Sequence, residues 1–212
     1  MIQAVIFNLD GVLTDTEACH EQAWRQMAGE QGIPFGPDIY RRMRGRKRTD
    51  ALTVLLSKAE RPYAPGETWA LAARKNDLFN EAVASLGREA ILPGAEETLT
   101  ALRQMNVMTA VASSSENAAG ILRKLHLDGL LDAVVDGEDV KRGKPDPEAF
   151  LQAARRLRVP TGACLVIENT LAGAEAARQA GMRCLLIGKE RDAAAESLQS
   201  LRLPRLIARE NG

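Results

Sequence analysis

The 212-residue sequence predicts an α/β fold, a doubly wound parallel sheet that carries an inserted all-helical domain. Three observations support this prediction. Short apolar runs recur along the chain, helical patterns alternate with them, and one long stretch near the N-terminus interrupts the alternation. Strand–helix alternation is typical of parallel sheets, because each connection between parallel strands needs a crossover and the crossover is usually a helix.

The predicted strands are four apolar runs and a fifth, weaker one. Each run is short and bounded by turn or polar residues, as expected for strands that are buried on both faces. The four runs are residues 4–7, 108–112, 165–167 and 184–187, and the weaker candidate is 133–135.

Helical patterns fill the segments between these runs. Their apolar residues recur at the three- and four-residue spacing that places them on one helix face. The stripes are Leu99, Leu102 and Met105; Ile121, Leu122 and Leu125; and Phe150, Leu151, Ala154 and Leu157 after Pro147. A further alanine-rich helix over 171–180 ends at Gly181, a residue type favoured just after a helix.

Residues 16–87 hold helical patterns, over 17–29, 51–59 and 67–86, and no convincing strand. This stretch follows the first strand directly and precedes the next β–α unit. We therefore expect 16–87 to form a helical cap domain, and 1–15 with 88–212 to form the core domain. The cap should cover the carboxyl edge of the sheet, where open α/β sheets bind their ligands.

Composition and charge narrow the function classes. The 28 basic and 28 acidic side chains cancel, so no bulk surface for nucleic acid or membrane is predicted. The three cysteines form no CxxC pair, which fits a reducing compartment. No apolar run approaches the roughly 18 residues of a membrane span, and the N-terminus lacks a basic leader. We expect a cytoplasmic monomer that binds a small molecule.

Asn8 and Asp10 directly follow the first predicted strand. Because side chains alternate along a strand, residues two apart point to the same side. Gly11 permits the turn that follows. The alternative is an ordinary strand end, where Asn and Asp serve as turn formers.

Three further polar motifs stand at the ends of strands or the starts of helices. Ser113 and its two following serines precede a helix expected to hold Glu116 and Asn117 in its first turn, which suits an anion or simple N-capping. Lys144 lies in a stiff Gly-Lys-Pro turn and is either a phosphate ligand or a solvated lysine. Glu168 and Asn169 could meet magnesium or cap a helix. Together, the four motifs converge on one sheet edge.

The order of these motifs resembles the haloacid dehalogenase superfamily, which has a Rossmann-like core. Its motifs are a DxD pair, a Ser or Thr, a Lys and an acidic pair. The resemblance implies that the first aspartate forms an aspartyl-phosphate and that the second, Asp10 here, is the general acid and base. It also implies that Mg²⁺ screens the charge between the carboxylates and the phosphate.

The helical insertion is similar to the cap of the β-phosphoglucomutase subgroup, which exchanges phosphate between C1 and C6 of β-D-glucose phosphates. The residues that carry this likeness are Thr14, Asp15, Thr16, His20 and Trp24, then Arg44, Gly45 and Arg48, then Arg74, Lys75 and Asn76.

The resemblance assigns roles to individual residues. Ser113 and Lys144 would hold the transferring phosphate, and Ser114 would be a further residue that binds the substrate or its phosphate. Gly45, Arg48 and Asn117 would hold the far phosphate or the sugar. His20 and Lys75 would couple cap closure to chemistry. The metal positions would be Asn8, Asp10 through its backbone carbonyl, Glu168 and Asn169. Alternatively, His20 is a partly buried cap residue, Lys75 lies on a solvated helix face, and Arg48 belongs to a basic cluster facing water.

The sequence departs from the family pattern at two catalytic positions, where Asn8 and Asn169 replace aspartates. An amide oxygen is a poor nucleophile, and losing a covalent nucleophile costs roughly 10⁴–10⁶-fold in rate. Magnesium prefers anionic oxygens, so its binding should be weakened. We expect phosphosugar binding to survive and turnover to be crippled. Two changes of this kind are typical of a ligand-trapping variant or of a natural relative without turnover.

Three functions are compatible with this pattern. The first is a β-phosphoglucomutase-type mutase impaired by Asn8 and Asn169, and the second is a phosphatase of small phosphosugars. The third is a non-catalytic sugar-phosphate-binding protein. Glu116 stands where a neutral or basic residue is expected near the far phosphate, so the identity of the sugar stays open.

Overall fold

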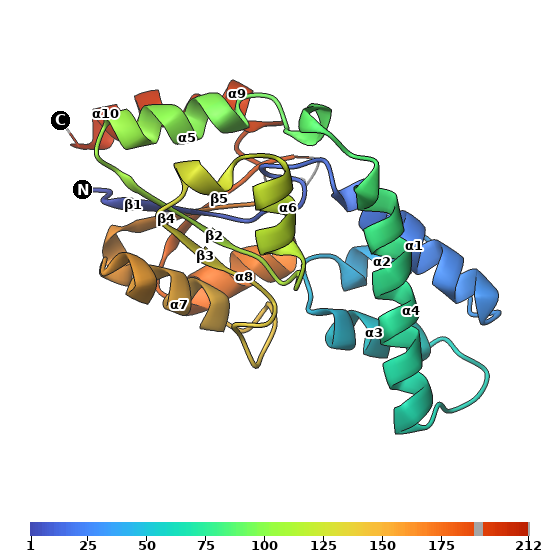
Figure 1. Ribbon diagram of the computed structural model, residues 1–212. Coiled ribbons are helices and arrows are strands. Elements are labelled where there is room, and N and C mark those ends of the chain that lie inside the picture. The colour runs from blue at the N-terminus through green and yellow to red at the C-terminus, as the bar shows by residue number, and fades with distance from the viewer. Residues whose placement is uncertain (189–192, 212) are drawn as a thin grey trace.

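The computed structural model describes residues 1–188 and 193–211, and its centre is a five-stranded parallel sheet (Figure 1). The strand order is β3-β2-β1-β4-β5. The strands are β1 (Ala4–Phe7), β2 (Met108–Ala112), β3 (Ala133–Val135), β4 (Cys164–Glu168) and β5 (Arg183–Leu186). The predicted fold class is confirmed, including the weak third strand. The last strand lies one residue earlier than predicted, because Ile187 instead bridges to Ala195.

Both faces of the sheet are covered by helices, and strand β1 shows how. Ala4 and Ile6 belong to the core beneath α7 (Glu148–Leu157) and α8 (Leu171–Gln179). Val5 and Phe7 point to the opposite core, with α5 (Ala95–Gln104), α6 (Ala118–Lys124) and α10 (Leu203–Asn211). Figure 1 shows α5 and α10 on one side of the sheet and α7 and α8 on the other. The short helix α9 (Leu198–Leu201) contacts α5.

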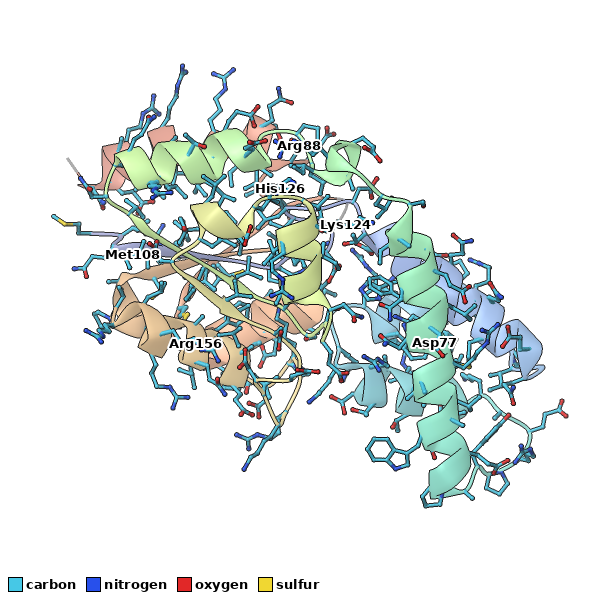
Figure 2. All side chains as sticks on the ribbon, viewed as in Figure 1. Asp77, Arg88, Met108, Lys124, His126 and Arg156 are labelled. Atoms are coloured by element: carbon cyan, nitrogen blue, oxygen red, sulfur yellow. The ribbon has the colours of Figure 1, made fainter. Side chains whose placement is uncertain are left out.

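The inserted stretch contains four helices and lies beside the sheet, beyond the carboxyl ends of its strands (Figure 1). They are α1 (Glu17–Glu30), α2 (Pro37–Met43), α3 (Arg48–Leu56) and α4 (Pro65–Ala84). Helices α1 and α4 pack closely along each other. Lys124, at the end of α6, donates from Nζ to the Val83 carbonyl (2.9 Å) and to the Ala84 carbonyl at the end of α4 (Figure 2).

Three helices differ from the local expectations. Helix α3 begins at Arg48, three residues before the predicted start, and α2 was not predicted. Helix α6 begins at Ala118, so Glu116 and Asn117 precede it rather than form its first turn. The reason is local hydrogen bonding: Ser113 Oγ accepts from the backbone N–H of Ser115 (3.0 Å), which favours a turn over a helix.

The register of the sheet sets where the predicted motifs meet. Phe7, the last residue of β1, pairs with Val111 on one side and Ile167 on the other. The side chains that follow these three residues therefore leave the sheet at nearly the same level. Among the described residues, we find no helix that is both long enough and apolar enough to span a bilayer.

Candidate active site

Lys144 is the centre of a buried polar cluster at the carboxyl edge of the sheet. Its side chain is 1% exposed. Its ammonium nitrogen donates to Asn8 Oδ1 (3.0 Å), to the Ala112 carbonyl (2.9 Å) and to Glu168 Oε1 (2.6 Å). A lysine ammonium has three hydrogens, so all of them are used by protein acceptors.

The Glu168 carboxylate is equally well satisfied. Its second oxygen, Oε2, accepts from the backbone N–H groups of Asn169 (2.7 Å) and Thr170 (2.9 Å) and from the Thr170 hydroxyl (2.9 Å). Gly173 makes room for this carboxylate, because a Cβ at that position would lie 1.9 Å from Glu168 Oε1. The buried charge of Glu168 is therefore compensated by Lys144 and by backbone and hydroxyl donors.

The orientation of the Asn8 amide follows from its neighbours. Because Lys144 can only donate, the atom of Asn8 that faces it must be the carbonyl oxygen. The amide nitrogen then points the other way, and it donates to the Asp10 carbonyl (3.1 Å) and to Asn169 Oδ1 (3.0 Å).

These contacts test whether the predicted metal positions fit magnesium. The four positions do come together: Asn8, Asp10, Glu168 and Asn169 lie at one sheet edge. A divalent cation needs several oxygen lone pairs aimed at one point. Here the Asn8 amide N–H points at two of the candidate oxygens, and within the described residues no three His, Cys, Asp or Glu side chains gather into a ligand set. The residues present do not fit the ion.

A second polar network connects Asp10 to the helical insertion. Asp10 Oδ1 accepts from the Thr16 hydroxyl (2.5 Å) and lies 3.4 Å from His20 Nε2. His20 Nδ1 lies 2.7 Å from Lys75 Nζ, and the imidazole stacks on Phe79 at 4.0 Å between ring centroids. With Lys75 donating to Nδ1, the His20 proton sits on Nε2 and points to Asp10.

Burial and mutual charge shift the pKa values of this network. Burial opposes ionisation of Asp10, yet the attraction of His20 and the hydrogen bonds from His20 and Thr16 outweigh it, so the Asp10 pKa lies below its usual value. Burial and the Lys75 ammonium lower the pKa of His20. Burial, followed by repulsion from Arg48, lowers the pKa of Lys75 to about 7. Of the three groups, Lys75 is therefore the one whose pKa lies near neutral pH.

The predicted sugar and far-phosphate residues lie between the insertion and the core. Arg48 Nη2 pairs with Glu116 Oε2 at 2.6 Å, and Asn117 Nδ2 donates to Asn76 Oδ1 at 2.9 Å. The Ser114 hydroxyl donates to the Gly45 carbonyl at 2.7 Å. Each of these contacts joins the inserted helices to the core, so the two parts are closed on each other.

A cavity of about 80 Å³ lies between the two parts. Eight of the predicted site residues line it: Asn8, Asp10, His20, Gly45, Arg48, Lys75, Ser114 and Asn117. The other predicted residues, Ser113, Lys144, Glu168 and Asn169, are buried behind it. Neither Lys75 nor Arg48 lies on a solvated face, which excludes the alternative interpretation of both.

Sequence reasoning missed Glu17 as a residue of this site. Glu17 Oε2 accepts from Asn169 Nδ2 (3.0 Å) and from Arg44 Nη2 (2.8 Å). Burial raises the pKa of Glu17 even though Arg44 opposes the shift. In the sequence, Glu17 looks like an ordinary acidic residue in the first turn of a helix. The one indirect indication was its neighbour Thr16, which belongs to the segment that resembles the start of the family's cap.

Residues 2–181 match the family model of haloacid dehalogenase-like hydrolases. A β-phosphoglucomutase of Bacillus subtilis is 39% identical over 190 residues, covering 89% of this chain and 84% of the relative. A phosphorylated carbohydrates phosphatase of Thermotoga maritima is 33% identical over 184 residues, covering 85% and 82%.

A solved structure gives the same result. The crystal structure of β-phosphoglucomutase from Clostridium difficile matches with a TM-score of 0.92 and 30% identity, covering 100% of this chain and 98% of that one. The structural agreement extends over the sheet and the inserted helices, and the family model covers most of the sequence. The chain therefore belongs to the haloacid dehalogenase-like hydrolases and, within them, to the β-phosphoglucomutase-like subgroup.

Proposed function

We propose that this chain carries the phosphosugar site of a β-phosphoglucomutase-type mutase, with its covalent step blocked at Asn8. The observation that carries the proposal is the hydrogen bond from Lys144 to Asn8 Oδ1. The atom that would have to attack phosphorus is a neutral amide oxygen already engaged by a cation. No neighbouring base can activate it, because an amide oxygen carries no proton to remove.

The proton-transfer residues support a sugar substrate. Asp10 would hold the proton that passes to or from a sugar hydroxyl, at a carboxyl oxygen contacted by Thr16 and His20. We infer that His20 and Lys75 orient this carboxyl only while the helical insertion, 16–87, is closed on the core, 1–15 and 88–212. A mutase benefits from such coupling, since closure excludes the water that a phosphatase would use.

Magnesium supplies charge screening to members of this family when it is bound. In this chain the Asn8 amide points its hydrogens at the candidate ligand oxygens, so we assign the ion no step. The residues that remain would bind and orient a phosphosugar, exclude water and hold a proton at Asp10.

Two other functions have specific support. The Thermotoga maritima relative is named a phosphatase, and Escherichia coli has a fructose-1-phosphate phosphatase that is 31% identical over 178 residues. A binding protein without turnover is favoured by the hydrogen-bonded amides of Asn8 and Asn169, which place no carboxylate at either position.

One experiment separates these functions. Asn8→Asp and Asn169→Asp are introduced together, and the protein is assayed with β-glucose 1-phosphate, a sugar bisphosphate primer and Mg²⁺. Formation of glucose 6-phosphate supports the mutase, and release of free phosphate supports the phosphatase. Inertness with retained phosphosugar binding supports the binding protein and overturns the proposal. The matched control is Asn80→Asp, the same charge change at an exposed position of α4.

A further inference from the structure

The two asparagines belong to one continuous row of hydrogen bonds that crosses from the core to the inserted helices. Lys144 donates to Asn8 Oδ1, Asn8 Nδ2 donates to Asn169 Oδ1, and Asn169 Nδ2 donates to Glu17 Oε2. Each of the three distances is 3.0 Å. Lys144, Asn8 and Asn169 come from the core, whereas Glu17 begins helix α1. We call these four residues the amide relay.

Arg44 secures the end of the relay. Its guanidinium forms an ion pair with the Glu17 carboxylate and lies 3.4 Å from the Asn169 carbonyl, to which Nη2 donates. Arg44 follows α2 and so belongs to the insertion, as Glu17 does. The insertion therefore contacts Asn169 through an acceptor, the Glu17 carboxylate, and through a donor, the Arg44 guanidinium.

With Lys144 at one end of this row and Glu17 at the other, each of the two middle side chains must both accept and donate a hydrogen bond. Each asparagine accepts with its oxygen and donates with its nitrogen, whereas an ionised aspartate can only accept. A carboxylate at position 8 has no hydrogen for Asn169. At position 169, a carboxylate would face the Glu17 carboxylate at about 3 Å, where like charges repel. The two departures from the family pattern are thus parts of one arrangement.

The backbone leaves room for the relay at Gly11. This residue has φ +78°, and a Cβ there would lie 2.1 Å from Asn169 Nδ2 and 2.7 Å from Glu17 Oε2. The backbone of the insertion also approaches the core closely at Gly45, where a Cβ would lie 2.5 Å from the Thr170 hydroxyl oxygen. The Asn169 and Glu17 side chains can therefore approach only because both loops turn at glycine.

We propose that Asn8 and Asn169 act together as positioning residues that hold Glu17 and Arg44 on the core, so that this chain closes without metal or ligand. The inference rests on the proposed function in one respect, that this sheet edge is the phosphate site. Since all three Lys144 hydrogens are used, a phosphate can reach this lysine only by displacing one of its acceptors.

The test is hydrogen–deuterium exchange of the segment 43–48 in the full chain, measured with a chelator present and without substrate. Asn169→Asp should raise the exchange of this segment about 10- to 100-fold, the effect of losing a charged hydrogen bond and adding repulsion. Asn80→Asp controls for the charge change and should leave the segment at the native rate. An unchanged rate in Asn169→Asp overturns the proposal.

A second variant distinguishes loss of the relay from general damage. Combining Asn169→Asp with Glu17→Gln reverses the polarity of one hydrogen bond, since the glutamine amide can donate to the new carboxylate. Exchange should return to within about threefold of the native rate, far below the single variant. Exchange as fast as in Asn169→Asp alone contradicts the relay. The exchange measurement needs no turnover. It can therefore refute the relay while the mutase assay succeeds, and it can support the relay while the mutase assay fails.

Discussion

Two polar networks meet at the end of strand β1, and they differ in what they can do. The amide relay contains a lysine whose three hydrogens are all used, two neutral amides, and the Glu17 carboxylate held by Asn169 and Arg44. The network of Asp10, His20 and Lys75 keeps groups whose pKa values burial and charge have moved. Under the proposed function, phosphoryl acceptance and proton transfer are therefore separable, since the residues proposed for the first are altered and those proposed for the second are kept.

The largest expected effect concerns Asp10. In the variant carrying Asn8→Asp and Asn169→Asp, the further change Asp10→Asn should lower turnover by roughly 10²–10⁴-fold, because a positioned acid and base is lost. In the native chain the same change should not alter product formation, which is already blocked at position 8. Steady-state assays measure product formation with and without Asp10→Asn, in the double variant and in the native chain. A small loss in the restored background would mean that Asp10 is not the proton-transfer group.

Replacing Lys144 tests how much the buried ion pair of Lys144 and Glu168 contributes to the free energy of unfolding. Lys144→Ala leaves the Glu168 carboxylate without its ammonium in a site that is 0% exposed, so the free energy of unfolding should fall by about 3–5 kcal/mol. Urea unfolding measures it. The exposed pair of Arg183 and Glu210 is the control, and Arg183→Ala should cost no more than about 1 kcal/mol. Equal losses in the two variants would contradict the account of the buried cluster.

The pH dependence of stability tests the second network. The Lys75 pKa is lowered to about 7 in the folded chain, below its value of 10.5 when unfolded. Between these values the unfolded state binds more protons, so Lys75 makes stability rise with pH, by at most about 1.4 kcal/mol per pH unit.

Lys75→Met should remove this rise, and Lys58→Met, at an exposed position, should keep it. Urea unfolding at several pH values between 7 and 9 provides the comparison. A native slope that Lys75→Met leaves unchanged would show that another group titrates.

The smallest expected effect lies at the far end of the cavity. Glu116 pairs with Arg48, and its carboxylate opposes a phosphate placed beside that guanidinium. Glu116→Gln should strengthen binding of a sugar bisphosphate about fivefold, the scale of a partly exposed ion pair. Titration calorimetry against Glu97→Gln, an exposed control, detects it. Weaker binding would mean that Glu116 helps to hold the ligand.

The sequence predicted those parts of the molecule that depend on local patterns. The strands and the polar residues at their ends could be predicted, because buried apolar runs and the register of a parallel sheet bring Asn8 and Glu168 together. The helix start after Ser113 was wrong, because serine hydroxyls compete locally for backbone N–H groups. The contact of Glu17 with Asn169 joins residues 152 positions apart, and no local pattern encodes it.

The most direct test of the central claim is phosphorylation of the protein itself. The native chain and the Asn8→Asp, Asn169→Asp variant are incubated with an acyl phosphate and Mg²⁺, and their intact masses are measured. We expect the variant to gain one phosphoryl group and the native chain to gain none. Stoichiometric phosphorylation of the native chain would contradict the claim that Asn8 blocks phosphoryl acceptance.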